Sequence, residues 1–247
     1  MRLLELTDVR KRFGGLWAVD GVTLAVPPSR IVGLIGPNGS GKTTLLNTIN
    51  GAYPADGGTL ELDGQAVGGL PAHRMAQRGV TRTFQAARVF STLTVRENML
   101  LPTLPSGGAS VDAEERALEL VQTVGLGRLW DEPASELSGG QQKLLEFARA
   151  LITRPRLLLM DEPFAGVHPE IVKTMTTRLL ALRDEGLCVI VVSHEIPVVM
   201  GLVDEVVCMS DGRMIAHGPP EVVDQDPHVL EAYLGTPRGS EGDADGD

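Results

Sequence analysis

One eight-residue segment, Gly36–Thr43 with the sequence GPNGSGKT, constrains this chain more than any other. It has the pattern G-x-x-x-x-G-K-[ST] and lies between the apolar run at 31–35 and a helix-like segment from Thr44. Glycines let such a loop curve so that its N–H groups face phosphate oxygens, and the helix that follows adds partial positive charge. We expect Lys42 to reach the β- and γ-phosphates and the Thr43 hydroxyl to bind Mg²⁺. A glycine-rich turn could precede a lysine by chance, but the flanking strand and helix favour nucleotide binding.

Composition excludes several classes of protein. The 247 residues are 43% hydrophobic and 22% charged, which is typical of a globular chain that buries a core. No run approaches the roughly 18–20 apolar residues of a membrane-spanning helix, and the early acid in Met1–Glu5 does not fit a signal peptide. Cys188 and Cys208 lie in apolar runs, so we expect buried thiols in a reducing cytosol rather than a disulfide or metal site.

The charge balance argues against nucleic acid as a partner. Net charge is −10, and four acids lie within 241–247, which leaves −6 for residues 1–240. A nucleic-acid surface needs a basic face instead. The Gly- and Asp-rich end, 236–247, is expected to be a disordered acidic tail.

The first part of the chain reads as strands around the loop. The expected strands are 3–9, 16–26, 31–35, 57–64 and 80–84, with a short helix from Pro71 to Gln77. Phe13 precedes the Gly14-Gly15 turn. Its ordinary interpretation is a hairpin or core aromatic, but among only 4% aromatics it is also a candidate for stacking on adenine.

Strand patterns stop between Ala86 and about Ala134. We expect a helix at 94–100, a loop at 102–108, and a helix that begins at Asp112 with Glu115 as its capping-box partner. The apolar face of that helix is Ala117, Leu118, Val121 and Val124. These patterns predict a helical subdomain inserted between strands.

The segment Leu137–Gln141, sequence LSGGQ, heads a further helix. Ser138 as N-cap and Gln141 as its capping-box partner explain two of these residues. They do not explain Gly139 and Gly140, because glycine in the first turn costs about 0.8–1 kcal/mol relative to alanine. Glycines fit there if a ligand approaches the exposed N–H groups closely.

Two buried strands end in polar groups. The run 157–160 is followed by Asp161 and Glu162, and the run 187–192 by Ser193 and His194. Ligands of doubly wound sheets bind at the carboxyl ends of strands. There Asp161 can hold Mg²⁺ through water, Glu162 can act as general base on the attacking water, and His194 can contact a γ-phosphate. Taken singly, each could also be an ordinary solvated side chain.

The remaining patterns are a helix from Pro169 to Glu185, a hairpin through Asp211-Gly212 joining 206–209 to 213–216, and a helix at 227–234.

These motifs together resemble the ATP-binding subunit of ABC transporters over residues 3–235. The resemblance implies a P-loop NTPase (RecA-like) α/β core with an antiparallel β subdomain, and a helical subdomain at about 86–150 within the domain 1–235. It implies that two subunits sandwich two ATP molecules, the loop of one facing LSGGQ of the other. The catalytic residues it implies are Lys42, Gln85, Glu162 and His194, and the groups for Mg²⁺ are Thr43, Gln85 and Asp161. The residues it implies for ATP binding are Phe13, Gly36, Pro37, Asn38, Gly39, Ser40, Gly41, Lys42, Thr43, Thr44, Ser138, Gly139, Gly140 and Gln141.

Within that family, several stretches are similar to the ATPases of branched-chain amino acid importers and their urea/amide relatives. They are 13–16 (FGGL), 83–85 (TFQ), 94–98 (TVREN), 166–169 (GVHP) and 231–235 (EAYLG). His168 and Glu195 depart from the residues common at their positions, which leaves open the cross-subunit contact made near His168.

The resulting expectation is an ATPase subunit, on the cytoplasmic face of the inner membrane, of an importer for branched-chain or other hydrophobic amino acids. Its implied partners are separate permease subunits, an identical or paralogous ATPase and, indirectly, a solute-binding protein. Another transport system (a urea/amide importer or an exporter) is an alternative. A non-transport ABC ATPase acting on nucleic acid or ribosomes is a further one, although no coiled-coil insertion, second cassette or basic surface supports it.

Overall fold

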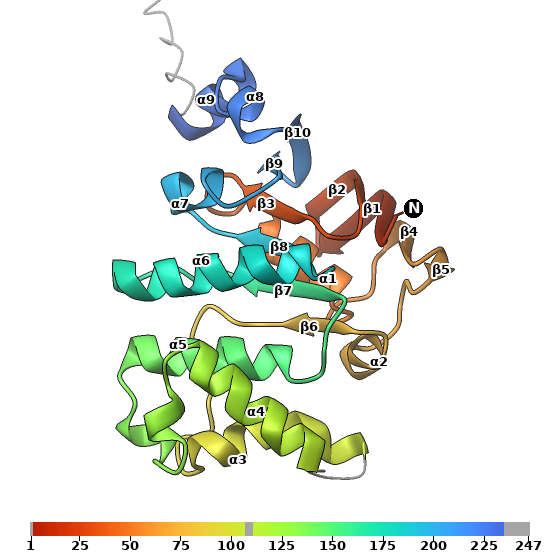
Figure 1. Ribbon diagram of the computed structural model, residues 1–247. Coiled ribbons are helices and arrows are strands. Elements are labelled where there is room, and N and C mark those ends of the chain that lie inside the picture. Colours follow the sequence, from red (N-terminus) through yellow and green to blue (C-terminus); the bar gives the residue numbers. More distant parts are fainter. Residues whose placement is uncertain (1, 107–110, 235–247) are drawn as a thin grey trace, which may run out of the picture.

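Two sheets organise the protein. The computed structural model describes residues 2–106 and 111–234. The larger sheet has the strand order β10-β9-β3-β8-β7-β6 and the smaller, antiparallel sheet the order β2-β1-β4-β5. In Figure 1, helices cover the larger sheet and α3, α4 and α5 gather at one end of the molecule. The predicted α/β class, with an antiparallel β part, is confirmed.

Five strands of the larger sheet run parallel. They are β6 (Val80–Arg82), β7 (Leu157–Asp161), β8 (Cys188–Val192), β3 (Ile31–Ile35) and β9 (Glu205–Ser210). β10 (Arg213–Gly218) closes one edge antiparallel to β9. The carboxyl ends of β6, β7, β8 and β3 therefore meet at the same edge of the sheet.

The unbroken apolar runs predicted strands covered on both faces, and every residue of β3, β7 and β8 is buried. Alternate side chains enter two different cores: in β7, Leu158 and Met160 join one core, whereas Leu157 and Leu159 join the other.

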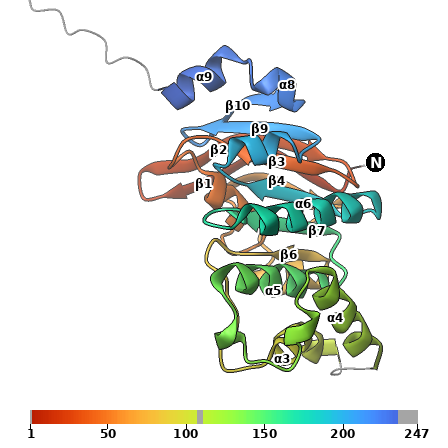
Figure 2. The same ribbon diagram turned by 60° about the vertical axis from the view of Figure 1, so that its left-hand side comes forward.

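Each core is closed by different elements. The first includes residues of α3 (Val95–Leu100), α4 (Val111–Thr123), α5 (Gly139–Leu151) and α6 (Pro169–Asp184). The second includes residues of α1 (Lys42–Ile49) and of the smaller sheet, β1 (Leu4–Phe13), β2 (Leu16–Val26) and β4 (Gly57–Leu62). β5 (Gln65–Ala66) pairs with β4, and α2 (Ala72–Gln77) precedes β6. Figure 2 shows the helical end, formed by α3, α4 and α5, beyond β6, and the smaller sheet near β3 and β9.

The helices between β6 and β7 form the region that the sequence marked as helical. Thr94 caps α3 through a capping box with Glu97. Asn98 is fully buried, and its amide group donates to the carbonyls of Phe90 and Thr94, both at 2.9 Å. These bonds fold the coil after β6 against α3. Short 3₁₀ turns at Leu101–Ser106, Gly127–Leu129 and Ala134–Glu136 join the helices.

Two expectations for this region are wrong. Val111 already belongs to α4, so Asp112 lies inside the first helical turn rather than at the N-cap, where its charge still favours the helix dipole. Leu120, rather than the partly buried Leu118, completes the apolar face with Ala117 and Val121, because a stripe with 3.6-residue period passes through 117, 120, 121 and 124. Part of the predicted loop at 102–108 forms the first 3₁₀ turn, and the rest lies outside the described residues.

Several strand ends also differ from prediction. β1 continues to Phe13 through three register shifts between Leu6 and Arg12, and it stays paired with β2 up to Phe13. β6 ends at Arg82, so Gln85 lies in coil beyond the strand. Pro71 is the N-cap of α2 rather than its first residue. The hairpin turn at Asp211-Gly212 is as expected, with φ of 47° and 79°.

Three short helices follow the last parallel strands. α7 (Ile196–Met200), after β8, and α8 (Pro220–Val223), after β10, were not expected, whereas α9 (Pro227–Leu234) was. Figure 1 shows α8 and α9 at the end of the molecule opposite the helical one. The predicted tail, 236–247, lies outside the described residues.

The two cysteines lie in β8 and β9 and are buried, as predicted. Burial raises the pKa of the Cys188 thiol to about 12 and that of Cys208 to about 11. Because the thiolate is the reactive form, we expect neither cysteine to react with iodoacetamide at pH 8 in the folded protein, and both to react in guanidinium. Mass spectrometry gives the count, with a cysteine peptide in the same mixture as control. Rapid labelling of the folded chain would contradict this packing.

Candidate functional site

The phosphate loop, Gly36–Thr43, joins β3 to α1 at the carboxyl edge of the parallel sheet. Gly36 and Gly41 have φ of 141° and 100°, which glycine adopts without a Cβ clash. A Cβ on Gly36 would lie 2.1 Å from the carbonyl oxygen of Met209, and one on Gly41 2.1 Å from that of Ala18. The loop is therefore held between β9 and β2, and only glycine fits at these two positions.

Lys42 folds back over this loop. Its ammonium group donates to the carbonyls of Gly36 at 2.8 Å and Pro37 at 2.9 Å, and to the Ser40 hydroxyl at 3.3 Å. Burial lowers the pKa of Lys42, and the negative charge of Glu162 opposes that shift. Burial and fixed contacts hold one cation beside the loop's N–H groups, as phosphate binding requires.

Asp161, the last residue of β7, lies beside the start of α1. The Thr43 hydroxyl donates to Asp161 Oδ1 at 3.4 Å. Hydroxyl and carboxylate oxygens are the ligands that Mg²⁺ prefers, and Mg²⁺ commonly takes only one or two protein groups beside phosphates and water. In the described part of the chain, no cluster of three or more His, Cys, Asp or Glu could hold a metal alone. The pair Thr43–Asp161 fits Mg²⁺ bound together with phosphate.

Arg82 is a partner of Asp161 that the sequence analysis missed. It donates to Asp161 Oδ2 at 2.7 Å, and the two side chains are only 6% and 7% exposed. Arg82 also donates to Asn47 of α1. The sequence did contain one indication of this pair. Arg82 lies in a predicted strand, and pairing of that strand with the one that ends at Asp161 would bring the two side chains close together.

Glu162 and His194 lie together at the ends of β7 and β8. Glu162 Oε2 accepts from the His194 backbone N–H at 3.2 Å and lies 2.9 Å from His194 Nδ1. The Glu162 side chain is 13% exposed, and that of His194 59%. Glu162 has φ of 51°, which is unfavourable for a residue with a Cβ, while its N–H donates to Val192 at 2.8 Å. The backbone thus turns the carboxylate toward the cleft at the sheet edge.

A cleft of about 610 Å³ brings most of the predicted site residues together. Its lining includes Leu16, Trp17 and Ala18 of β2, Asp211 and Gly212 of the β9–β10 turn, and Val192. The predicted site residues that line it are Asn38, Gly39, Ser40, Gly41, Lys42, Thr43, Thr44, Gln85, Asp161, Glu162 and His194.

Phe13 does not line this cleft. Its ring is 45% exposed and packs edge-on against Tyr53, with centroids 5.2 Å apart, while Lys11 Nζ lies 5.4 Å from the ring centroid. Leu16 and Trp17, from the same hairpin, line the cleft instead. Stacking of Phe13 on adenine stays a prediction. Gly36 and Pro37 are also absent from the lining, and both act through their carbonyls on Lys42.

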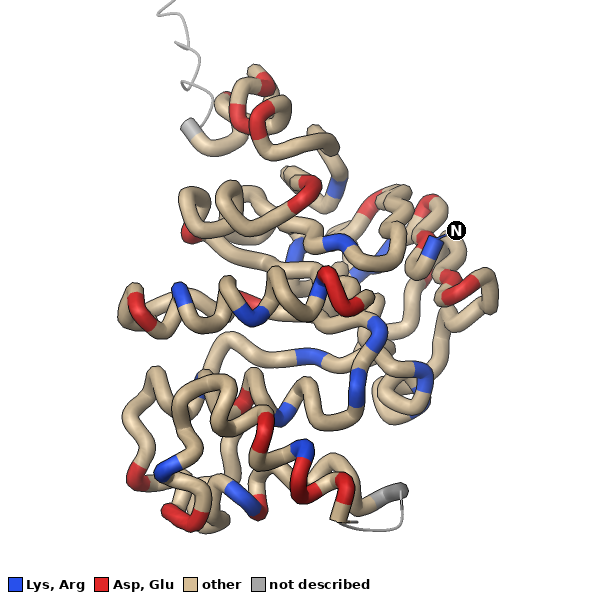
Figure 3. Tube along the Cα trace, in the orientation of Figure 1, with Lys and Arg blue, Asp and Glu red and all other residues tan. Residues whose placement is uncertain are grey.

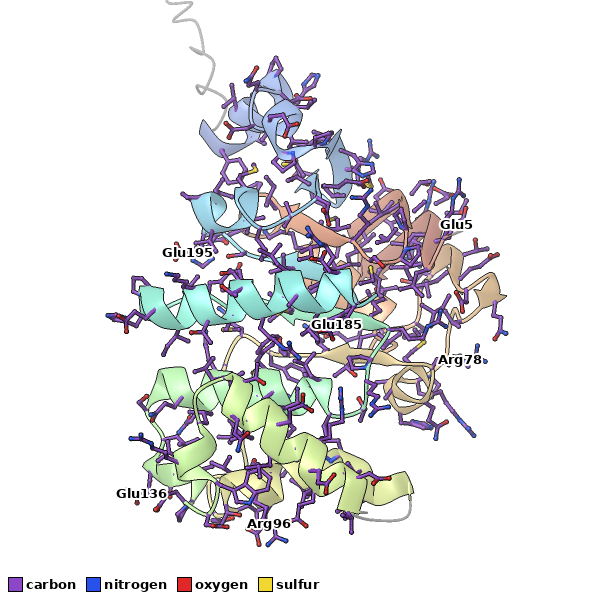
Figure 4. All side chains as sticks on the ribbon, in the orientation of Figure 1. Glu5, Arg78, Arg96, Glu136, Glu185 and Glu195 are labelled. Atoms are coloured by element: carbon purple, nitrogen blue, oxygen red, sulfur yellow. The ribbon has the colours of Figure 1, made fainter. Side chains whose placement is uncertain are left out.

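The residues 138–141 are likewise absent from the cleft lining. Ser138 and Gln141 form the predicted capping box of α5. A Cβ on Gly139 would meet nothing within 4 Å, whereas one on Gly140 would lie 2.5 Å from Ile171 Cδ1 of α6. The Ile171 Cδ1 methyl is the end of a flexible side chain and can move aside, so this contact alone does not require glycine at Gly140, and Gly139 faces open space. Figure 4 shows Glu136, just before this segment, at the helical end, and Glu195, next to His194, beside α6 and α7.

His168, the departure from the family pattern, caps α6. Its Nδ1 accepts from the Glu170 N–H at 3.4 Å. Lys143 of α5 holds the loop between Glu162 and His168, because its ammonium group donates to the Ala165 carbonyl at 2.8 Å. The helix that begins at the LSGGQ segment is thereby tied to the residues that follow Glu162.

Comparison with known proteins agrees with this geometry. Residues 19–165 match the family model described as ABC transporter, and residues 213–238 match one described as branched-chain amino acid ATP-binding cassette transporter. The chain is 38% identical to the high-affinity branched-chain amino acid transport ATP-binding protein BraF of Pseudomonas aeruginosa, and also to LivG of Escherichia coli. Each alignment covers 94% of this chain and 98% of the relative.

Solved structures agree as well. The ADP conformation of an ATP-binding cassette of an ABC transporter has a TM-score of 0.86 and 33% identity, and covers 96% of this chain and 100% of that one. A dimeric post-hydrolysis cassette bound to ADP and phosphate has a TM-score of 0.79 and 27% identity, with coverage of 88% and 98%.

Arg82→Gln tests the buried ion pair. We expect the free energy of unfolding to fall by about 3 kcal/mol, because Asp161 would stay buried without its countercharge. Urea unfolding measures the change, and Arg128→Gln, at an exposed position, is the matched control, with an expected change below about 0.5 kcal/mol. Equal stability of the two variants would mean that Asp161 does not depend on Arg82.

Proposed function

Because the chain belongs to the ABC transporter family of ATP-binding subunits, we propose that it powers the uptake of branched-chain or other hydrophobic amino acids through separate permease subunits. The chain is an ABC importer ATPase. The supporting observation for the amino acid class is that both curated relatives and the model matched at residues 213–238 carry that description. The permease and its solute-binding protein would choose the solute.

The arrangement in the cleft supports a division of labour in ATP hydrolysis. The loop N–H groups and Lys42 would bind the β- and γ-phosphates, while Thr43, Asp161 and Gln85 would hold Mg²⁺. Bound Mg²⁺ would neutralise phosphate charge. Glu162 would take a proton from the attacking water, and His194, which contacts Glu162 Oε2, would hold that carboxylate and face the γ-phosphate.

One observation supports a site completed by a second subunit. Ser138 and Gly139 lie at the N-terminus of α5, outside the lining of the chain's own cleft, and Gly139 has open space beside it. The first N–H groups of a helix favour an anion. In a head-to-tail pair of ATPases, identical or paralogous, each α5 would complete the other's phosphate site.

Membrane attachment would come from the permeases. No helix in the described ranges is long and apolar enough to cross a bilayer. Net charge is −10, and Figure 3 shows acidic and basic residues interspersed along the chain. The subunit would therefore sit peripherally on the cytoplasmic face of the inner membrane.

Glu162→Gln should stop hydrolysis yet stabilise an ATP-bound dimer. We expect turnover to fall by roughly 10²–10⁴-fold, because an amide cannot accept the proton of the attacking water, whereas the size of the side chain is unchanged. Loss of one negative charge beside the γ-phosphate also lowers repulsion in the closed site. Size-exclusion chromatography with ATP and Mg²⁺ detects the dimer.

Two variants make this experiment specific. Ser138→Arg added to Glu162→Gln should abolish the dimer, and Glu195→Gln should leave turnover at the wild-type rate. A Glu162→Gln protein with normal turnover would remove Glu162 from the mechanism. A variant that is inactive but monomeric would keep the base role and favour a paralogous partner.

Sedimentation tests the mode of membrane attachment. Expressed alone, the chain should remain in the supernatant with vesicles of anionic phospholipid, because its net charge of −10 opposes attraction to an anionic surface. Co-expressed with its permeases, it should pellet with membranes. Neutral phosphatidylcholine vesicles are the control, and tight binding to the anionic vesicles alone would contradict permease-mediated attachment.

A further inference from the structure

The C-terminal helix makes a direct bond to the phosphate loop. Tyr233, on the last turn of α9, accepts a hydrogen bond through its hydroxyl from the Gly36 N–H at 2.7 Å. The two residues are 197 positions apart in the sequence. Gly36 is the first residue of the loop, directly after β3.

Gly36 joins this bond to the catalytic lysine. Its N–H is held by Tyr233, and its carbonyl accepts from Lys42 Nζ at 2.8 Å. The bond from Tyr233 and the bond from Lys42 are thus made to the two polar groups of one residue. A displacement of the Tyr233 hydroxyl that moves Gly36 would also move the carbonyl that holds Lys42.

The hydroxyl is not needed to anchor α9. Val229 is 5% exposed and belongs to the first core, whereas Tyr233 is 41% exposed. Val229 thus anchors the helix in the core, whereas Tyr233 is only partly covered. Burial of the phenol oxygen raises the pKa of Tyr233 to about 12, so the hydroxyl is neutral at physiological pH and keeps lone pairs for the Gly36 N–H.

We propose that Tyr233 is a positioning residue for nucleotide binding: its hydroxyl holds Gly36, and through Gly36 the Lys42 ammonium group, in the geometry that receives phosphate. The position of α9 and the occupancy of the phosphate loop are then coupled. This role concerns nucleotide binding by the ATPase and does not depend on which solute is imported.

Tyr233→Phe tests the proposal at equilibrium. The variant keeps the ring and removes only the acceptor, so we expect the Kd for Mg·ADP, measured by titration calorimetry, to rise roughly two- to tenfold, the range for one lost hydrogen bond. Glu231→Gln, an exposed change on the same helix, is the matched control with an unchanged Kd. The urea midpoint of Glu231→Gln should match that of the wild type, and the midpoint of Tyr233→Phe should fall by no more than one lost hydrogen bond accounts for. A wild-type Kd for Tyr233→Phe would overturn the proposal.

Hydrogen exchange of the unmodified protein gives a second test. Coupling is reciprocal, so saturating Mg·ADP should slow amide exchange in α9. In Tyr233→Phe, α9 should exchange at the same rate with and without Mg·ADP. A purely structural tyrosine would instead speed exchange of α9 equally in both conditions. Absence of any nucleotide effect on α9 in the wild type would also overturn the proposal.

Discussion

The groups that could act on a phosphate depend on one property of the parallel sheet: its strands end at the same edge. β3 delivers the phosphate loop there, β7 delivers Asp161 and Glu162, β8 delivers His194, and β6 delivers Arg82. The four strand ends that carry these groups are far apart in the sequence. Both faces of the sheet are buried, which fixes the register of its strands. The positions of the polar side chains at the strand ends are therefore fixed as well.

Charge at this edge is balanced by pairs that link separate strands and helices. The Arg82–Asp161 pair joins β6 to β7, and Arg82 also reaches Asn47 of α1. A hydrogen bond also connects α5 to this edge, because Lys143 donates to the carbonyl of Ala165, in the loop after β7. A buried ion pair adds little net stability, but loss of one partner is costly. These contacts are therefore better understood as fixing positions: a movement of Asp161 would strain three elements at once.

The sequence predicted what is periodic or local, and missed what is tertiary. The runs at 31–35 and 157–161 were found because strands buried on both faces are wholly apolar, and the cap at Ser138 because it uses neighbours only. Arg82 and Tyr233 could not be found in this way, since their partners are 79 and 197 residues away. The predicted helix start at Asp112 was wrong because acidic residues are favourable both at the N-cap and in the first helical turn, and the sequence alone does not distinguish the two positions.

The residues of the LSGGQ segment differ in whether contacts within the chain explain them. Ser138 and Gln141 bond to each other's backbone N–H groups, so the capping box satisfies the helix start within the chain. Beside Gly140 a Cβ would meet only the terminal methyl of Ile171, at 2.5 Å. What the chain itself does not explain is Gly139, whose missing side chain leaves the end of the helix dipole open to solvent. The chain offers no contact that accounts for the helix-propensity cost of Gly139, and this agrees with our proposal that a phosphate bound by a second ATPase subunit lies against this helix start.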